Sequence, residues 1–198
     1  SMLRQLRLLG RYNVWATTQL IRASKKLTSI QVKEDCGLVF GSFHSTLSHL
    51  VLADEIWYGR IVPTYKCPVP SDKLSLCWHD QAPPDVWSTI FEQHWGRGAV
   101  GEEMVDVTRE LLSSSQRWLA LVEDEDLSES ELENFFIYQD SSGAKMQKRL
   151  GPVLTHVFNH QTHHRGQATA ALTRLLGKDH CPSLDLLYYL AEQPEEQR

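Results

Sequence analysis

The sequence predicts an all-α protein, a four-helix bundle with a minor β-hairpin before its last long helix. Three observations support this fold class. Four long segments repeat apolar residues every three or four positions, which is the period of an amphipathic α-helix. A single short segment has the composition of paired strands. The overall composition, with 41% hydrophobic and 23% charged residues, is that of a globular protein able to bury a substantial core.

The first two long helices are expected over residues 3–27 and 42–62. In the first, leucines are interleaved with arginines and lysines at helical spacing. The second has one broad apolar stripe, which consists of Phe43, Leu47, Leu50, Ala53, Ile56, Trp57 and Ile61. We expect Pro63 to end this second helix, because proline disrupts the hydrogen bonding of a helix interior.

The middle of the chain is rich in proline and glycine. Five prolines between residues 63 and 85 predict a loop. A further helix should start near Pro84 or Asp85, since proline is tolerated in the first turn, and the glycines at 96–101 should interrupt it. The third long helix is then expected over about 102–124.

The last third of the chain contains the hairpin and the fourth long helix. Strand-forming residues over 132–149 flank a Ser-Ser-Gly turn signal. The helix is expected over 152–176, with Gly177 at the C′ position, where a positive φ angle is common. The apolar stretch at 184–190 should dock on the helices, whereas the polar tail from about residue 193 should fray.

Length and charge limit the classes of protein. We expect one domain over residues 1–198, with Ser1 as a remnant of tag cleavage ahead of Met2. A net charge of -5 with scattered basic residues argues against a nucleic-acid partner. No run approaches the roughly 20 apolar residues that span a bilayer, so no membrane association is expected.

The cysteines favour a reducing compartment. Four cysteines without a C-x-x-C pair are too few for a disulfide scaffold in a chain of this size, so we expect a cytoplasmic protein. Cys67 and Cys77 lie ten residues apart in the proline-rich stretch. They are interpreted as free thiols, with a zinc pair or a redox pair as the alternative.

Histidines are the most informative residues of this sequence. Four of the nine, His156, His160, His163 and His164, fall within nine residues of one expected helix. Positions i and i+4 share a helix face, so His160 and His164 can present two imidazoles to one ion. The spacing alone is a weak motif. A glycine inside a helix costs about 1 kcal/mol of stability. Gly166, beside the histidine pair, therefore strengthens the motif, because close helix packing or access to a site would explain its presence.

A metal site needs a third ligand, and the candidates are His44, His49 and His156. We favour His49, because it lies on the apolar stripe of the second helix and a buried imidazole needs a partner for its nitrogen. The alternative is a core histidine whose nitrogen is satisfied by a backbone carbonyl or by water. Spacing does not separate these two interpretations.

The stretch HVFNHQTHHRGQ at 156–167 resembles the signature helix of the DinB/YfiT-like metalloenzyme family, in which Asn-His is followed after three residues by His-Arg-Gly-Gln. Three further stretches resemble the same family. These are YNVWATTQL at 12–20, HLVLADEIWYGRI at 49–61 and DLLYY at 185–189. The similarity therefore extends over nearly the whole chain, and the proline-rich loop is its least typical part.

This resemblance implies a four-helix bundle with up-down-down-up connectivity, often dimeric, and one divalent metal ion held by three histidines. By position, those ligands are His49, His160 and His164. Zinc, nickel and iron all suit three imidazoles. Family members with known activity include thiol S-transferases and a thiol-dependent isomerase, which implies a small-molecule thiol and an electrophile as partners, and a homodimer as the assembly.

Three imidazoles leave an open position on the ion, as in catalytic sites. The leading hypothesis is thus metal-dependent thiol S-transfer. Asn159 and Gln167 are expected to hydrogen-bond the ligand histidines, and Arg165 to anchor an anionic cosubstrate or to pair with an acid. Trp57 is interpreted as a core or pocket residue. The alternatives are a metal-dependent hydrolase, with Asp54 as its base, and a non-catalytic metal-binding stress or interaction protein.

Overall fold

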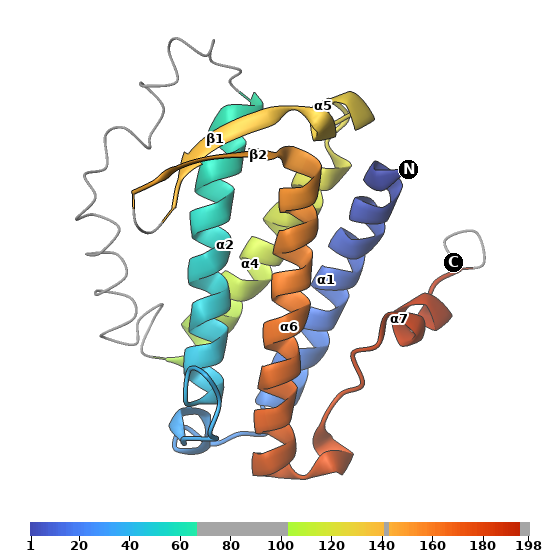
Figure 1. The fold of residues 1–198 in the computed structure, drawn as a ribbon. Coiled ribbons are helices and arrows are strands. Elements are labelled where there is room, and N and C mark those ends of the chain that lie inside the picture. Colours follow the sequence, from blue (N-terminus) through green and yellow to red (C-terminus); the bar gives the residue numbers. More distant parts are fainter. Residues whose placement is uncertain (67–102, 141–142, 195–198) are drawn as a thin grey trace.

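The structure, a computed structural model, describes residues 1–66, 103–140 and 143–194. These residues are mostly helical, and one small antiparallel hairpin accompanies the helices, as the sequence predicted (Figure 1). Within them, no helix is both long enough and apolar enough to cross a membrane.

Four long helices make up most of the described chain. They are α1 (Met2–Ser24), α2 (Phe43–Lys66), α4 (Met104–Glu123) and α6 (Leu150–Leu176). Both α1 and α2 pack against α4 and against α6, and the four lie side by side in Figure 1. Ser1 lies at the N-cap of α1, where its side chain accepts a hydrogen bond from the backbone N–H of Arg4.

The prediction that Pro63 ends the second helix is wrong, because α2 continues to Lys66. A proline removes one backbone hydrogen bond and crowds the preceding turn, but a helix that is packed along its length can continue past it. The expected helix near Pro84, most of the expected loop at 63–85, and Cys67 and Cys77 lie outside the described residues.

The hairpin prediction is confirmed. Strand β1 (Phe135–Gln139) pairs with β2 (Lys145–Arg149), with Phe135 opposite Arg149. Gly143, in the turn, has a φ angle of +81°, a conformation that glycine adopts at little cost. The shorter helices are η1 (Gln31–Lys33), α5 (Glu129–Glu133), η3 (Lys178–His180) and α7 (Leu186–Glu192).

The C-terminal segment docks on α1, as expected for the stretch at 184–190. The Tyr12 hydroxyl donates a hydrogen bond to the carbonyl oxygen of Leu184 at 2.5 Å, and the indole Nε1 of Trp15 donates one to the Glu192 carboxylate at 2.8 Å. Two aromatic side chains of α1 therefore hold both ends of the docked segment.

An apolar cluster fixes the start of α2 against the neighbouring helices. Phe43, Leu47 and Leu50 of α2 are fully buried and pack with Leu111 of α4 and Leu172 of α6. Full burial of a side chain of this size stabilises the fold by about 1.5–3 kcal/mol. This cluster thus positions α2 and α6, the two helices that carry the histidines singled out in the sequence.

Candidate metal centre

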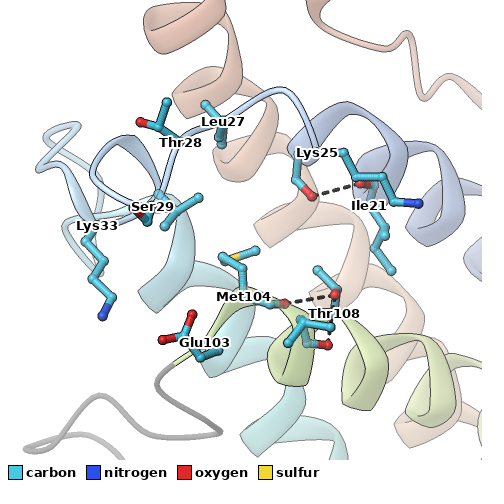
Figure 2. A pocket seen from close by; sticks show the side chains of 12 residues that line it. Ile21, Lys25, Leu27, Thr28, Ser29, Lys33, Glu103, Met104 and Thr108 are labelled. Atoms are coloured by element: carbon cyan, nitrogen blue, oxygen red, sulfur yellow. Dashed lines mark hydrogen bonds between the residues drawn. The ribbon is translucent and has the colours of Figure 1, made fainter.

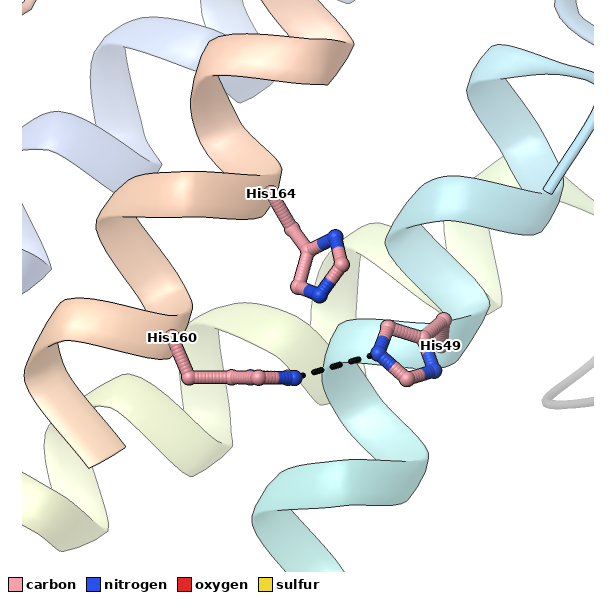
Figure 3. A group of neighbouring side chains, drawn as sticks. All are labelled: His49, His160 and His164. Carbon is pink, nitrogen blue, oxygen red and sulfur yellow. Dashed lines mark hydrogen bonds between the residues drawn. The ribbon is translucent and has the colours of Figure 1, made fainter. Parts of the chain in front are cut away.

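Three histidines from two helices converge on one point (Figure 3). His160 and His164 lie one turn apart on α6, and His49 faces them from α2. Their ligand nitrogens all lie within 4.8 Å of one another. The structure therefore brings together the three residues that the sequence singled out, in a group that could hold a metal ion.

The spacing of the nitrogens fits a single ion. Two nitrogens that each lie about 2.0–2.1 Å from a tetrahedral zinc ion are about 3.3 Å apart, and the Nε2 atoms of His49 and His160 are 3.2 Å apart. The three ring centroids lie between 4.4 and 5.1 Å from one another, and the rings are steeply tilted rather than stacked. Tilted rings can direct their lone pairs toward a common point.

Burial keeps these imidazoles in the neutral form. Burial first, and then the charges of the neighbouring histidines, lowers the pKa of His49 to about 3 and that of His160 to about 4. The pKa of His164 is also lowered, mainly by burial. Because only a neutral imidazole has a lone pair for a metal, the group is ready to bind an ion at neutral pH.

Gln167 orients one of the three rings. Its side-chain oxygen lies 2.8 Å from Nδ1 of His164. An amide oxygen only accepts hydrogen bonds, so Nδ1 carries the hydrogen and Nε2 retains the lone pair. Hydrogen bonds of this kind fix the tautomer of metal-binding histidines, which is the role expected for Gln167 from the sequence.

Other residues singled out in the sequence do not belong to the group. Asn159 is exposed on α6. The ring of Trp57 contacts His156 at a centroid distance of 5.4 Å, and His156 lies 5.9 Å from His160, so Trp57 is one ring removed from the group. His44, which was also a candidate for the third ligand, is buried on α2 and is not part of the group.

Arg165 directs its guanidinium into the core, toward α1. It is 1% exposed, donates hydrogen bonds to Asn13 and Thr162, and lies over the ring of Tyr12. The direction follows from helix geometry, because residue 165 is rotated by about 100° from residue 164. Its hydrogen-bond partners among the described residues are neutral. Burial lowers the pKa of Arg165, and the charge of the buried Asp54 opposes this shift. This placement favours a core role over the expected anionic cosubstrate.

Phe40 lies at the site and was not anticipated from the sequence. Its ring is stacked on the imidazole of His49 at a centroid distance of 4.0 Å and lies 5.4 Å from that of His164. Phe40 precedes α2 in a loop, where no helical periodicity indicates the direction of a side chain. A local sequence signal for this contact is therefore absent.

Asp54, considered as a general base for hydrolysis, is held inside the core. Its carboxylate oxygens accept hydrogen bonds from Ser114 at 2.6 Å and from Gln161 at 2.5 Å. Burial raises the pKa of Asp54 to about 6, although these hydrogen bonds oppose the shift. Both oxygens are engaged by core side chains rather than directed at an exposed substrate.

A cavity of about 360 Å³ opens elsewhere on the molecule, between the end of α1, the residues around η1 and the start of α4 (Figure 2). Its lining mixes apolar side chains with lysines, hydroxyl groups and Glu103. None of the three converging histidines lines it. The histidine group and this cavity are therefore separate features.

Comparison with known proteins agrees with the resemblance noted in the sequence. The chain matches the sequence profile of the DinB family over residues 2–198. The chain belongs to the DinB family. It is 28% identical over 185 residues to Protein DinB of Bacillus subtilis (strain 168), and this alignment covers 93% of the chain and 94% of that relative. No solved structure matches the chain with significance.

Two of the stretches that resemble the DinB family are in contact in the structure. The stretch at 12–20 contains Asn13, and the stretch at 156–167 contains Arg165, the residue that donates a hydrogen bond to Asn13. The hydrogen bond joins α1 to α6 next to His164. The stretch at 12–20 thus supports helix α6, and the stretch at 156–167 places two of the three histidines on that helix.

Proposed function

We propose that this DinB protein binds one divalent metal ion through His49, His160 and His164, and that it is a metal-dependent thiol S-transferase. The observation that carries the proposal is the convergence of three ligand nitrogens within 4.8 Å. The ion is proposed to be zinc, nickel or iron, since all three accept imidazole ligands. A low-molecular-weight thiol and a small electrophile are the proposed reactants.

The donor set supports a reactive site. When bound, an ion held by three neutral imidazoles keeps its double charge and an open position, and so favours the thiolate form of a thiol. His49 and His160 stay neutral because they are buried. Gln167 holds the tautomer of His164. These residues prepare the site, and the carbon that accepts sulfur would come from the second substrate.

We also propose the finer architecture implied by the family. The packing of α1 and α2 against both α4 and α6 supports a four-helix bundle, with up-down-down-up connectivity and one domain over 1–198. A homodimer is the proposed assembly. Crosslinking or light scattering of the purified protein tests whether it is a homodimer.

The two alternative functions differ from thiol transfer in what they require. In a hydrolase, a general base beside the ion would assist the attack of metal-bound water. Asp54, the candidate for that role, is engaged in the core by Ser114 and Gln161. This observation favours thiol transfer over hydrolysis. A metal-binding stress or interaction protein needs only the ion, so a ligand-binding experiment has to separate it from an enzyme.

The metal proposal is tested first. Elemental analysis of protein purified without a metal-affinity column should find about one divalent ion per chain, and the His164→Ala variant should lose most of it. His163→Ala, which alters the neighbouring residue outside the group, is the matched control. Equal metal content in wild type and His164→Ala would contradict the proposed site.

Thiol binding is tested on the cobalt-loaded protein. Small thiols should change its visible absorption spectrum, because a sulfur ligand would enter the open position. Turnover of an electrophile with the same thiol then tests transfer. No spectral response to thiols, together with hydrolysis of model esters, would favour the hydrolase, and no response to either would favour the binding protein.

A further inference from the structure

The ring of Phe40 contacts two of the three converging histidines. It is stacked on His49 with centroids 4.0 Å apart and an angle of 21° between the ring planes, and it lies 5.4 Å from His164 at 54°. Phe40 therefore covers one side of His49 and touches a histidine on the opposite helix. This contact is part of neither the hydrogen-bonding scheme of Gln167 nor the apolar cluster at the start of α2.

The loop that carries Phe40 is held in a defined conformation. The backbone N–H of Cys36 donates to the carbonyl of Gly41 at 2.8 Å, and that of Gly41 donates to the carbonyl of Leu38 at 2.9 Å. Gly41 has a φ angle of +78°, which favours glycine. Ser42 follows and accepts a hydrogen bond from the backbone N–H of Ser45 in the first turn of α2. These hydrogen bonds fix the course of the loop and connect it to the start of α2.

Different contacts limit the rotation of the His164 and His49 rings. Nδ1 of His164 is hydrogen-bonded to Gln167, which limits rotation of that ring. The His49 ring is in addition stacked on an aromatic face, with its plane 21° from that of Phe40. Rotation of the imidazole about its Cβ–Cγ bond would drive its edge into Phe40, so the stack limits rotation as a hydrogen bond would.

We infer that Phe40 is a positioning residue of the metal centre, which holds the His49 imidazole in the plane needed for binding and closes one side of the site with an apolar wall. The inference rests on the metal-binding part of the proposed function. The loop before α2 would thereby raise metal affinity beyond what the three ligands supply by themselves.

The test is a titration of the full-length, metal-free protein with cobalt, followed by its visible spectrum. Phe40→Ala should weaken cobalt binding about tenfold, the effect of losing a group that orients a metal ligand, and it should alter the spectrum because His49 can rotate. Phe40→Tyr keeps the ring and should bind within about threefold of wild type. Phe40→Leu keeps apolar volume without a flat ring, and should resemble Phe40→Ala in affinity while remaining folded.

Phe136→Ala is the matched control. Phe136 is buried and stacked on Tyr138 in the hairpin, with centroids 5.5 Å apart at 28°, and it touches none of the three histidines in the described contacts. Its loss should lower the midpoint of thermal unfolding and leave cobalt affinity unchanged. A general loss of stability is thereby separated from a specific effect on the site.

The outcomes separate this inference from the proposed function. If wild type binds cobalt and both Phe40→Ala and Phe40→Leu bind it with unchanged affinity and spectrum, Phe40 is a packing residue and the inference is overturned, while the metal site stands. If wild type binds no cobalt, the metal proposal fails and this inference fails with it. Weakened binding in both variants, restored in Phe40→Tyr, supports the inference.

Discussion

Asp54 on α2 accepts a hydrogen bond from Gln161, the residue that directly follows His160 on α6. Ser114 of α4 donates to the other oxygen of the same carboxylate. The Asp54 side chain is buried, as are both of its partners. Three helices, including the two that carry the histidines, therefore meet at one ionisable group.

The buried carboxyl should make stability depend on pH. Burial raises the pKa of Asp54 from 3.8 to about 6 in the folded protein, so the folded state binds the proton more tightly than the unfolded state does. The contribution of the protonated Asp54 carboxyl to stability is fully present below the pKa of this group in the unfolded state. It is lost as pH rises through about 6, the pKa in the folded state. Asp54→Asn removes this dependence.

The comparison is made by denaturant unfolding of the metal-free wild type and Asp54→Asn at pH 7.5 and pH 5. Between these pH values, the wild type should gain about 1–1.5 kcal/mol relative to the variant. Taking the difference cancels the histidines, which titrate in both proteins. Parallel pH profiles for the two proteins would show that the Asp54 carboxyl has no raised pKa.

Metal affinity should be nearly independent of pH between 7.5 and 5.5. A histidine with its ordinary pKa of 6.5 is about 90% protonated at pH 5.5 and competes poorly for a metal. Burial lowers the pKa of His49 to about 3 and that of His160 to about 4 in the metal-free protein, and it lowers the pKa of His164 as well. Protons should therefore compete with the metal only at lower pH. Cobalt titrations at both pH values check this, and a loss of tenfold or more at pH 5.5 would be incompatible with it.

Replacing Gln167 should weaken metal binding through His164. Gln167→Ala removes the acceptor for Nδ1–H of His164, and loss of such a partner typically costs 10- to 100-fold in affinity, with about tenfold expected here. Gln167→Glu keeps an acceptor and should retain the affinity. Gln167 also lies 3.3 Å from His163, so His163→Ala is the control, and it should bind metal as wild type does.

Gly166→Ala should stabilise the protein by about 1 kcal/mol, the helix-propensity difference between the two residues. Close packing was one explanation expected for this glycine, and the described residues do not supply it. A Cβ atom at residue 166 would meet no described atom within 4 Å. Gly10→Ala is the opposite case, because its Cβ would lie 2.8 Å from a methyl group of Val122. Thermal unfolding of the two variants should therefore shift in opposite directions, and a destabilised Gly166→Ala would contradict the prediction.

Much of the local structure was predictable because helices and turns depend on residues a few positions apart. The four-residue spacing of His160 and His164 places both on one face of any helix. Apolar periodicity located the long helices, and glycines marked the hairpin turn and the end of α6 at Gly177. The error at Pro63 has the same origin, since the rule that proline ends a helix considers only neighbours along the chain, and α2 continues to Lys66.

The contacts that complete the site join residues far apart in the sequence. The sequence favoured His49 over His44 and His156 as the third ligand, but spacing did not separate a ligand from a core histidine. The packing of α2 against α6 brings His49 to the pair. Three other contacts likewise have no local signal in the sequence. They are the stacking of Phe40 on His49, the hydrogen bond between Gln161 and Asp54, and the hydrogen bond that Arg165 donates to Asn13. They arise because helix packing sets which side chains meet, and that depends on the whole core rather than on neighbours along the chain.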